Sequence, residues 1–474
     1  MFSAVSKLRV FAFALALLSL MALGSGLAFG QAVSGNVVGT VTDSSGAAVV
    51  NADATATNVA TGVAVTAKTG STGEYRFDNL PAGSYRIAVK SSGFRTTTVN
   101  VEILLNQTGT ANVTLSPGAS TETIEVSGEA PIIDTSTAQL QNTYQEKQLL
   151  DLPTTGLGVS PNGQNLGVLN LSLLEAGVGS SGGLGAGTGP SIGGQRPRNN
   201  NFVVEGIDNN DKGVTGPVVN VPNDAVQEFS TLQNQYSPEF GHSTGGQFNV
   251  AVLGGTNTFH GRAYEYLQNR KLNAIDIATV RNTAVGVTPS NPRFDNNRYG
   301  GQLGGPIFKN KLFFFANYEV QPIGQATQPP SALILPTAAG YATLSAVTGV
   351  NTTSIAQLQK YAVAPSPCTV ITATCHDFNV GEATIQGGNL GVVAPNFSNT
   401  KALVTSMDYN LSDRDQIRGR YIYNKTTAVD TNAALPVFYT TVPVSAHLVT
   451  LAEFHDLPLS ALIRKRTHVH LEDA

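Results

Sequence analysis

The sequence predicts a mainly β protein: an amino-terminal β-sandwich, a small mixed domain, and the start of an antiparallel membrane β-barrel that is incomplete. Short apolar–polar alternations between Gly, Asn and Pro turns fill the first half of the chain, and longer alternating runs fill the second. Glycine is abundant at 49 residues and charge is low at 13%. This composition favours strands and turns over long helices.

Length and charge set the outer limits of the interpretation. A chain of 474 residues has room for about two to four domains. The net charge is -4 and the basic clusters are short and scattered, so there is no electrostatic basis for nucleic-acid binding.

The first thirty residues predict an exported protein. Lys7 and Arg9 precede an apolar run over 10–23, and Ala28-Phe-Gly30 then forms a small-x-small cleavage pattern. The alternative is a membrane-anchoring helix, but the run is shorter than the roughly 20 residues that a span needs. We therefore expect residues 1–30 to be a signal peptide.

The two cysteines, Cys368 and Cys375, lie seven positions apart. In an exported protein, two such residues are expected to close a small loop through a disulfide. The rival interpretation is a metal site with His376 as a third ligand, although this spacing is not a zinc pattern.

Residues 31–116 predict a small antiparallel β-sandwich, because short alternating runs are separated there by Gly-containing turns. The i, i+2 spacing of the aromatic and aliphatic residues places them on one face of their strands. The expected core residues are Tyr75, Phe77, Leu80, Tyr85, Ile87, Val89 and Phe94.

The same segment resembles the carboxypeptidase regulatory-like domain. The residues that carry the resemblance are Gly39-x-Val41-x-Asp43-x-x-Gly46, Gly73-x-Tyr75-x-Phe77-x-x-Leu80-Pro81-x-Gly83-x-Tyr85, and Gly93-Phe94. Ala48 stands where the family often carries Pro, which we expect to loosen one turn. The family name implies no peptidase, and no His-x-x-Glu zinc pair occurs in the chain.

A second resemblance is centred on residues 201–261 and links the chain to the TonB-dependent outer-membrane receptors, especially the Oar-like group. It implies that residues 132–257 form the plug of such a receptor and that residues 258–456 form the first strands of its barrel. The motifs that carry it are Val204-Glu-Gly-Ile-Asp208, Tyr236-Ser-Pro-Glu-Phe-Gly241, Ser243-Thr-Gly-Gly246, Gly255-Thr-Asn-Thr-Phe-His-Gly261, Gly301-x-Leu303-Gly-Gly-Pro-Ile307 and Lys311-Leu-Phe-Phe-Phe-Ala-Asn-Tyr-Glu319.

Residues 117–131 are expected to be an extended linker between sandwich and plug. Within it, a short segment is similar to the family's TonB box, which pairs as a strand with an energising periplasmic partner. β-branched residues favour the exposed strand that such pairing needs. The alternative is an ordinary strand or plain linker. The segment consists of Glu122, Thr123, Ile124, Glu125 and Val126.

Within the plug, residues 143–152 predict a short helix that stops at Pro153. Part of the Gly-rich stretch 177–189 is expected to be a flexible linker. The resemblance suggests plug roles for four residues, of which Arg196 and Glu205 could equally be plug-to-wall ion pairs. The four are Gln195, Arg196, Glu205 and Asp208.

Five segments beyond residue 261 approach the roughly 9 to 11 residues of a membrane-spanning strand. They are 262–268, 297–308, 312–319, 402–411 and 416–424. Two of them predict which side faces lipid, since apolar and polar residues occupy opposite parities. The outward set is Leu403, Met407, Tyr409, Leu411, Ile417, Tyr421 and Tyr423; the inward set is Ser406, Asp408, Asn410, Gln416, Arg418, Arg420 and Asn424.

The turn at 411–415 is expected on the periplasmic side and residues 320–398 in a long external loop. About half a dozen strands are fewer than the roughly eight of the smallest single-chain barrels. Residues 447–455 still alternate, whereas 457–474 do not. This tail is expected to be aberrant, from truncation or a frameshift.

Two chemical motifs lack the context they need. Gly241-His-Ser-Thr-Gly245 matches the G-x-S-x-G of a hydrolase, but a β-patterned run follows where a helix is required. Asp208 to Gly213 begins like an EF-hand loop, but Lys212 occupies the fifth position and Val219 the place of the bidentate Glu. A looser Ca²⁺ site remains an alternative.

The sequence is therefore interpreted as the amino-terminal part of an outer-membrane transporter or receptor of a Gram-negative-type bacterium. The resemblance implies uptake or export of a ligand and three partners: a TonB-type protein, outer-membrane lipid and an external ligand. No catalytic residue, metal or cofactor is expected. The alternative is a secreted carbohydrate-binding or adhesion protein built on the sandwich, although its Tyr and Phe residues occupy core parity.

Overall fold

The structure is a computed structural model that describes residues 34–118, 123–126, 138–152, 167–180, 189–213, 216–236, 240–241, 243–275, 277–282, 290–291, 293–327, 333–369, 371–372, 375–390, 394–412, 415–430 and 435–455. The expected signal peptide, the tail 457–474 and Glu122 lie outside these ranges. Among the described residues, no helix combines the length and the apolar character that crossing a membrane requires.

The amino-terminal sandwich consists of two sheets. One has the order β4-β1-β7, with β8 also paired to β1, and the other has the order β3-β2-β5-β6-β9. β7 and β8 run parallel to β1, so the expectation of an antiparallel sandwich was wrong at these two strands. β9, which lies in the expected linker, runs parallel to β6. A parallel neighbour cannot be reached through a tight hairpin, so each of these strands is connected to its partner through other strands of the sandwich. The bounds are β1 Gly35–Asp43, β2 Asp53–Asn58, β3 Ala64–Lys68, β4 Glu74–Leu80, β5 Gly83–Lys90, β6 Thr96–Ile103, β7 Thr108–Thr110, β8 Val113–Leu115 and β9 Thr123–Val126.

The expected sandwich core lies between these sheets. Six of its seven predicted residues are at most 3% exposed, and Phe94 is partly buried against the same cluster. In the described sandwich strands and loops, 34–115, the exposed large hydrophobic residues are Val50 and Val59. Its aromatic rings are therefore committed to packing.

The segment expected to be a plug, called the plug below, is a five-stranded mixed sheet of order β10-β15-β16-β13-β14, with short helices beside it. The helix expected over 143–152 is shorter, because the chain up to Gln145 pairs with β15 and only Glu146–Asp151 is helical. The bounds are β10 Leu140–Gln145, α2 Glu146–Asp151, η1 Gly167–Leu174, β11 Val178–Ser180, β12 Pro190–Ile192, η2 Pro197–Asn199, β13 Asn201–Val204, β14 Ile207–Asp208, η3 Asn223–Ala225, β15 Val226–Asn234 and β16 Gln247–Val252.

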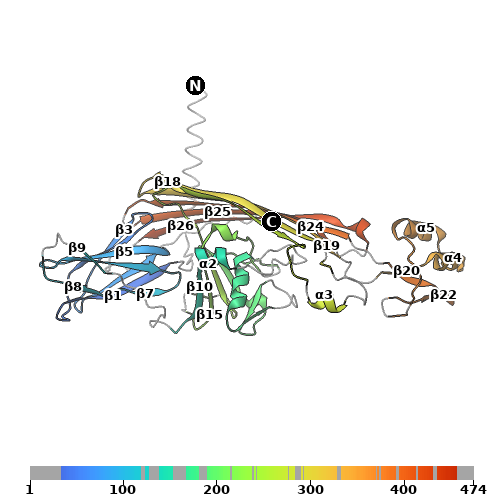
Figure 1. Ribbon diagram of the computed structural model, residues 1–474, viewed down its shortest axis with the longest axis horizontal. Coiled ribbons are helices and arrows are strands. Elements are labelled where there is room, and N and C mark those ends of the chain that lie inside the picture. Colours follow the sequence, from blue (N-terminus) through green and yellow to red (C-terminus); the bar gives the residue numbers. More distant parts are fainter. Residues whose placement is uncertain are drawn as a thin grey trace, which may run out of the picture.

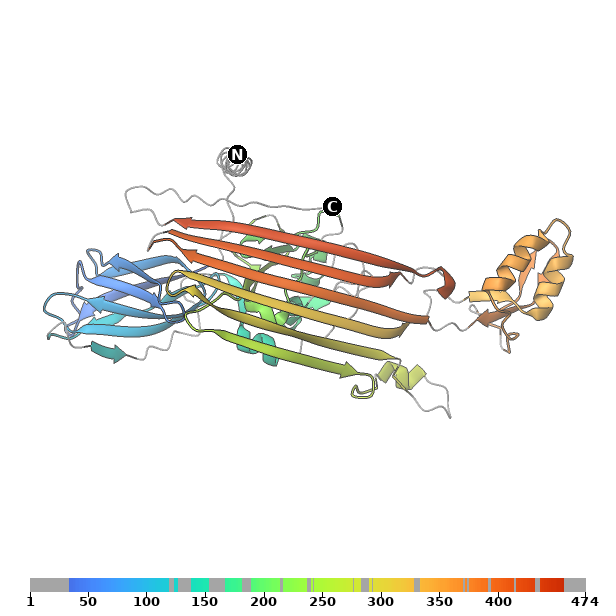
Figure 2. The same ribbon diagram turned by 90° about the horizontal axis from the view of Figure 1, so that it is seen from above.

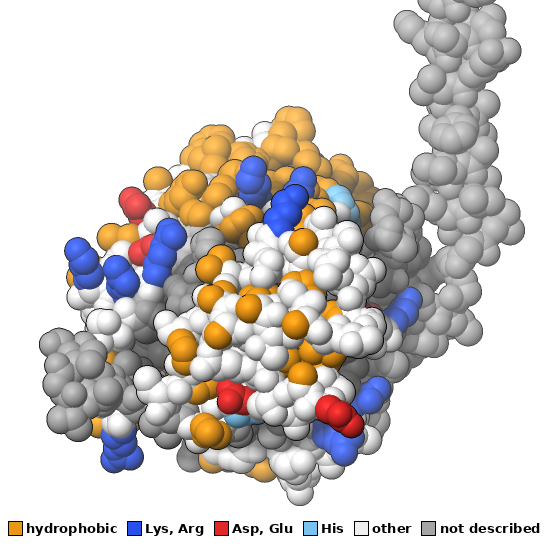
Figure 3. Space-filling model, turned by 90° about the vertical axis from the view of Figure 1, so that its right-hand side faces the viewer, with side chains coloured by type: hydrophobic (Ala, Val, Ile, Leu, Met, Phe, Trp, Pro, Cys, Tyr) orange, Lys and Arg blue, Asp and Glu red, His pale blue; other side chains and the backbone are white. Residues whose placement is uncertain are grey.

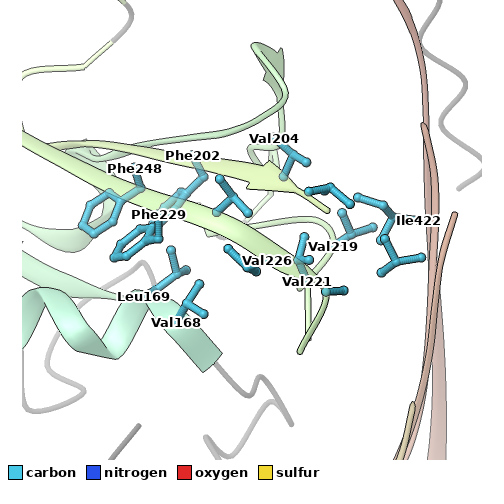
Figure 4. Packing of buried hydrophobic residues seen from close by; sticks show 14 of the residues in the cluster. Val168, Leu169, Phe202, Val204, Val219, Val221, Val226, Phe229, Phe248 and Ile422 are labelled. Carbon is cyan, nitrogen blue, oxygen red and sulfur yellow. The ribbon is translucent and has the colours of Figure 1, made fainter. Parts of the chain in front are cut away.

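One face of the plug sheet carries its apolar core (Figure 4). Phe248 stacks between Phe202 and Phe229, with ring centroids 5.1 and 6.2 Å apart. All three are at most 1% exposed. The opposite face carries polar side chains such as Glu228 and Ser230, which alternate with Phe229 along β15.

The third unit is a six-stranded antiparallel sheet of order β17-β18-β19-β24-β25-β26, which is unclosed (Figure 2). It curves over the plug as the start of a barrel (Figure 1). All five predicted barrel strands and the run at 447–455 lie in it, but four of the six strands continue for 16 or 17 residues. The bounds are β17 His260–Asn269, β18 Phe294–Phe308, β19 Leu312–Thr327, β24 Ala394–Asn410, β25 Asp415–Asp430 and β26 Thr440–His455.

The predicted parity of the barrel strands is confirmed. Val404, Ser406 and Arg420 are buried against the plug, whereas Met407 and Tyr409 on the opposite parity are 53% and 38% exposed. The short turns at 411–415 and 309–311 lie at the sandwich end of the sheet. Short turns lie on the periplasmic side of bacterial outer-membrane barrels, so this is the end that the sequence predicts to be periplasmic.

The opposite, outer end carries a small folded unit, not only the long polar loop that was expected at 320–398. Helices α4 and α5 pack beside short strands there, and a disulfide joins Cys368 to Cys375 with Cα atoms 5.7 Å apart. Viewed from this end, the unit shows few charged side chains (Figure 3). The remaining bounds are α3 Ile277–Asn282, β20 Leu333–Pro336, α4 Ala338–Ala346, α5 Thr352–Tyr361, β21 Phe378–Val380, β22 Ala383–Ile385, β23 Gly387–Leu390 and η4 Pro436–Phe438.

Candidate functional site: the contact of the plug with the barrel wall and the sandwich

Asp224 of η3 is the first ionic contact between plug and wall. Its side chain has no exposed surface, and its two oxygens face guanidiniums from neighbouring wall strands: Arg262 at 2.8 Å and Arg298 at 3.5 Å. The hydroxyl of Tyr266 donates to the same carboxylate at 3.1 Å. Burial raises the pKa of Asp224, and the two guanidiniums oppose that rise.

The wall holds Arg298 in position from its own side. Its guanidinium lies 4.3 Å from the ring centre of Tyr266 and 3.8 Å from the carboxylate of Glu319. Tyr264 in turn donates to Glu319 at 3.0 Å. Two carboxylates and two guanidiniums therefore share one buried polar region, as buried charges require.

Arg420 of β25 is the second ionic contact. It donates to Asp408 of the adjacent wall strand at 2.6 Å and forms an ion pair with Glu205 of the plug at 3.5 Å. Glu205 also accepts a hydrogen bond from the backbone N–H of Val252 at 2.8 Å. Only 5% of the Arg420 side chain is exposed, so little water separates these charges.

Neutral contacts extend the same surface. Asn424 accepts from the N–H of Asn220 at 2.6 Å and donates to its carbonyl at 3.1 Å, while Ser406 donates to the carbonyl of Leu253 at 2.8 Å. Ile422 packs among plug valines, including Val219 (Figure 4). The apolar wall residues of this cluster are Phe315, Val404, Ile422 and Leu448.

These contacts fix the orientation of the plug against the wall but add little to the stability of the complex between them. Fixed carboxylate–guanidinium pairs specify where the plug sits. Their net stabilisation is small, because each charge is well hydrated once the partners separate into water.

The sandwich contacts the face of the plug at the short-turn end of the sheet. Leu105, Asn106 and Gln107 follow β6 and contact β10 and β15, with Leu105 packed against Ala82 and Ala251. A cavity of about 510 Å³ lies beside this contact, between sandwich, plug and the inward residues of β25.

The structure places the predicted plug residues in different environments. Glu205 reaches the wall. Gln195 and Arg196 are exposed in the turn before η2, and Asp208 is exposed beside Asn210. The predicted coupling segment is described at Thr123–Val126, where its backbone forms β9 along β6.

The hydrolase-like and EF-hand-like motifs are hydrogen-bonded within the plug. Ser243 donates to the carbonyl of Asn199 and accepts from the N–H of Gly245. Asp211 accepts from the N–H of Gly213 at 2.6 Å. These bonds shape turns of the plug.

Asp224 and Glu228 were missed from the sequence, as was the role of the wall arginines. Strand parity had already placed Arg420 inward, and a buried guanidinium requires an acidic partner. That requirement could have directed attention to the plug carboxylates, although not to which one.

Comparison with known proteins assigns two segments of the chain. Residues 36–116 match the carboxypeptidase regulatory-like domain, and residues 251–457 match the outer membrane beta barrel domain. A TonB-dependent transporter, Oar of Myxococcus xanthus, is 31% identical over 308 residues, which is 62% of this chain and 28% of that protein. The chain thus spans under a third of that relative.

Two solved structures are similar at low identity. The outer membrane transporter YddB of Escherichia coli matches 67% of this chain and 37% of its own length, with 11% identity and a TM-score of 0.42. The siderophore receptor PiuA of Acinetobacter baumannii matches 70% and 44%, with 12% identity and a TM-score of 0.34.

Proposed function

We propose that this chain, a homologue of the TonB-dependent transporter Oar and an outer-membrane protein of Gram-negative bacteria, is the amino-terminal part of a transporter or receptor for an external ligand. In this proposal the plug blocks the barrel and a TonB-type periplasmic protein displaces it. The ligand crosses by uptake or export.

The observation that carries this proposal is the seating of the plug on the inward face of the sheet. Asp224 and Glu205 meet inward guanidiniums, while apolar residues such as Met407 occupy the opposite, lipid-facing parity. A sheet of a soluble protein with water on both faces would not need apolar side chains on one parity and charged side chains on the other.

The proposed coupling segment is β9. It is the last strand of its sheet, and within the described residues one of its edges pairs with β6 while the other has no strand beside it. A free strand edge offers backbone N–H and C=O groups to an incoming strand. A periplasmic partner could therefore add to β9 without first separating it from β6.

Site-directed disulfide cross-linking tests this assignment. Cysteine would be placed at Glu125 in β9, and at Asp78 in β4 as a sandwich control whose side chain is 43% exposed. Each variant would be mixed with the purified carboxyl-terminal domain of the host's TonB-type protein carrying a single cysteine on its pairing strand.

The expected result is a cross-link at position 125 and none at position 78. The cross-link at 125 should be lost when Ile124→Pro removes a backbone donor from the same strand. Equal cross-linking at both positions, or none at 125 in membranes where the chain is folded, would reject β9 as the coupling segment.

A further inference from the structure

Strand β6 connects two features that lie at its opposite ends. Its first half pairs in parallel with β9, from Thr96 beside Thr123 to Val99 beside Val126. Its last residue, Ile103, leads directly into residues 104–107, which contact the plug and are called here the docking loop. One continuous strand therefore runs from the proposed coupling segment to the plug.

The docking loop makes five hydrogen bonds to the plug, and in two of them the side chains of Gln139 and Gln141 donate to the carbonyls of Asn106 and Leu105, at 3.4 and 3.5 Å. The N–H of Leu105 donates to the carboxyl of Glu228 at 2.8 Å, and the side-chain amide of Asn106 donates to the hydroxyl of Ser230 at 3.0 Å. Gln107 donates to Thr143 at 3.4 Å. Beside them, Gln227 donates to the carbonyl of Ala82 at 2.9 Å.

Glu228 differs from the other groups of this contact because it is a buried carboxyl. Glu228 takes part in none of the ion pairs between described residues, and the negative charge of Glu102 adds to the rise in its pKa. Burial raises the pKa of Glu228 to about 8, and the Leu105 N–H partly offsets this. Glu228 is 3% exposed while the loop is docked, so departure of the loop would restore water to it.

We propose that the sandwich transmits force: load applied to β9 passes through β6 to the docking loop, and detaches that loop from Glu228 and Ser230 before the plug itself moves. This inference rests on the proposed function, since β9 is the segment that the periplasmic partner would grip. The competing route is direct, with β9 peeling from β6 and the load running along the chain that follows Val126.

The parallel pairing favours the first route. β9 and β6 run in the same direction, and the end of β6 leads into the docking loop, where Leu105 contacts the plug. A load along β9 therefore shears its backbone hydrogen bonds with β6 together, whereas the docking loop holds the plug by a few hydrogen bonds that each involve at least one side chain. Because each such bond contributes only about 1 kcal/mol, the loop contact is expected to separate first.

Single-molecule pulling on the full chain in a supported bilayer tests the order of events. A handle on residue 123 applies constant load, and the lifetime before the first extension step is measured. The wild type is compared with Glu228→Ala and Asn106→Ala, with the isosteric Glu228→Gln, and with Arg76→Ala, which lies in an exposed pair with Asp78.

Glu228→Ala and Asn106→Ala should each shorten the first lifetime about tenfold, the effect of roughly one hydrogen bond. Glu228→Gln keeps an acceptor for Leu105 and should stay within about threefold of wild type, and Arg76→Ala should leave it unchanged. Glu228→Gln also keeps the test informative where an alanine variant does not fold.

A cysteine pair at Thr98 and Glu125, which are partners in the ladder, separates the two routes. When this pair is oxidised, the disulfide links β9 covalently to β6. The first step should persist with its wild-type lifetime if load enters through the docking loop. Loss of the step on oxidation, together with no effect of the Glu228 and Asn106 variants, would overturn the proposal. Since no periplasmic partner is present, this result is independent of whether the partner binds β9.

Discussion

Glu205 and Arg420 form an ion pair at 3.5 Å across the boundary between plug and wall. Glu205 lies in the tight turn between β13 and β14 with a φ of +52°, followed by Gly206 at +79°. A left-handed conformation costs a residue with a side chain roughly 1–2 kcal/mol. The turn nevertheless presents Glu205, whose carboxylate reaches both Arg420 and the N–H of Val252.

The strength of this pair can be measured by a double-mutant cycle. Glu205→Gln, Arg420→Gln and the double variant should give a coupling energy of about 1–3 kcal/mol, because the pair is nearly buried. The measurement is the free energy of unfolding by urea in detergent micelles. The same cycle on the exposed pair Arg76 and Asp78 should give about 0–1 kcal/mol. Equal coupling in the two cycles would contradict the buried contact.

The pH dependence of stability should report Glu228. Its folded pKa of about 8 lies above the ordinary value of 4.5, so the folded state binds more protons than the unfolded state between these values. The stabilisation that Glu228 contributes is therefore complete below about pH 4.5 and is lost as the pH rises to about 8. Glu228→Gln does not titrate and should show a shallower fall in urea midpoint over this window. Glu175 and Asp224 shift in the same direction, so the difference between variant and wild type isolates Glu228; identical slopes would refute the assignment.

The lipid-facing parity predicts a position-dependent effect of charge. Met407 and Lys401 share one parity of β24, and Lys401 lies nearer the outer end. Met407→Arg should destabilise the sheet by about 2–4 kcal/mol, as a charge in the bilayer interior does. Lys401→Met should change little. Outer-membrane yield and urea midpoint in lipid vesicles provide the measurement, and equal tolerance of both variants would argue against a lipid-facing surface.

The disulfide should stabilise the outer unit alone. Replacing Cys368 and Cys375 by serine removes a constraint that is worth about 2–3 kcal/mol for so short a loop. Amide exchange should speed up in β21, β22 and β23, which lie close by in the chain. β24 is paired on both sides within the barrel sheet and should exchange as in the wild type, since local opening energies differ between units. Faster exchange in β24 as well would show that the units are coupled.

Periodicity and turn chemistry in the sequence determined the classes of structure. Alternation at Leu403 to Asn410 predicted both a strand and its outward face, because a two-residue period admits one arrangement at an oil–water boundary. The aromatic spacing from Tyr75 to Tyr85 predicted the sandwich core for the same reason. Local patterns of this kind are present in the sequence because each residue responds to its own surroundings.

Partnerships between distant segments were decided only by tertiary structure. Nothing in the local pattern of Asp224 indicates Arg262 and Arg298, and nothing near Glu228 indicates the N–H of Leu105, 123 positions away. The helix expected from residue 143 begins at 146 because β15 competes for the same backbone groups. Charge pairing depends on which surfaces meet in three dimensions, and one sequence read alone does not specify that meeting.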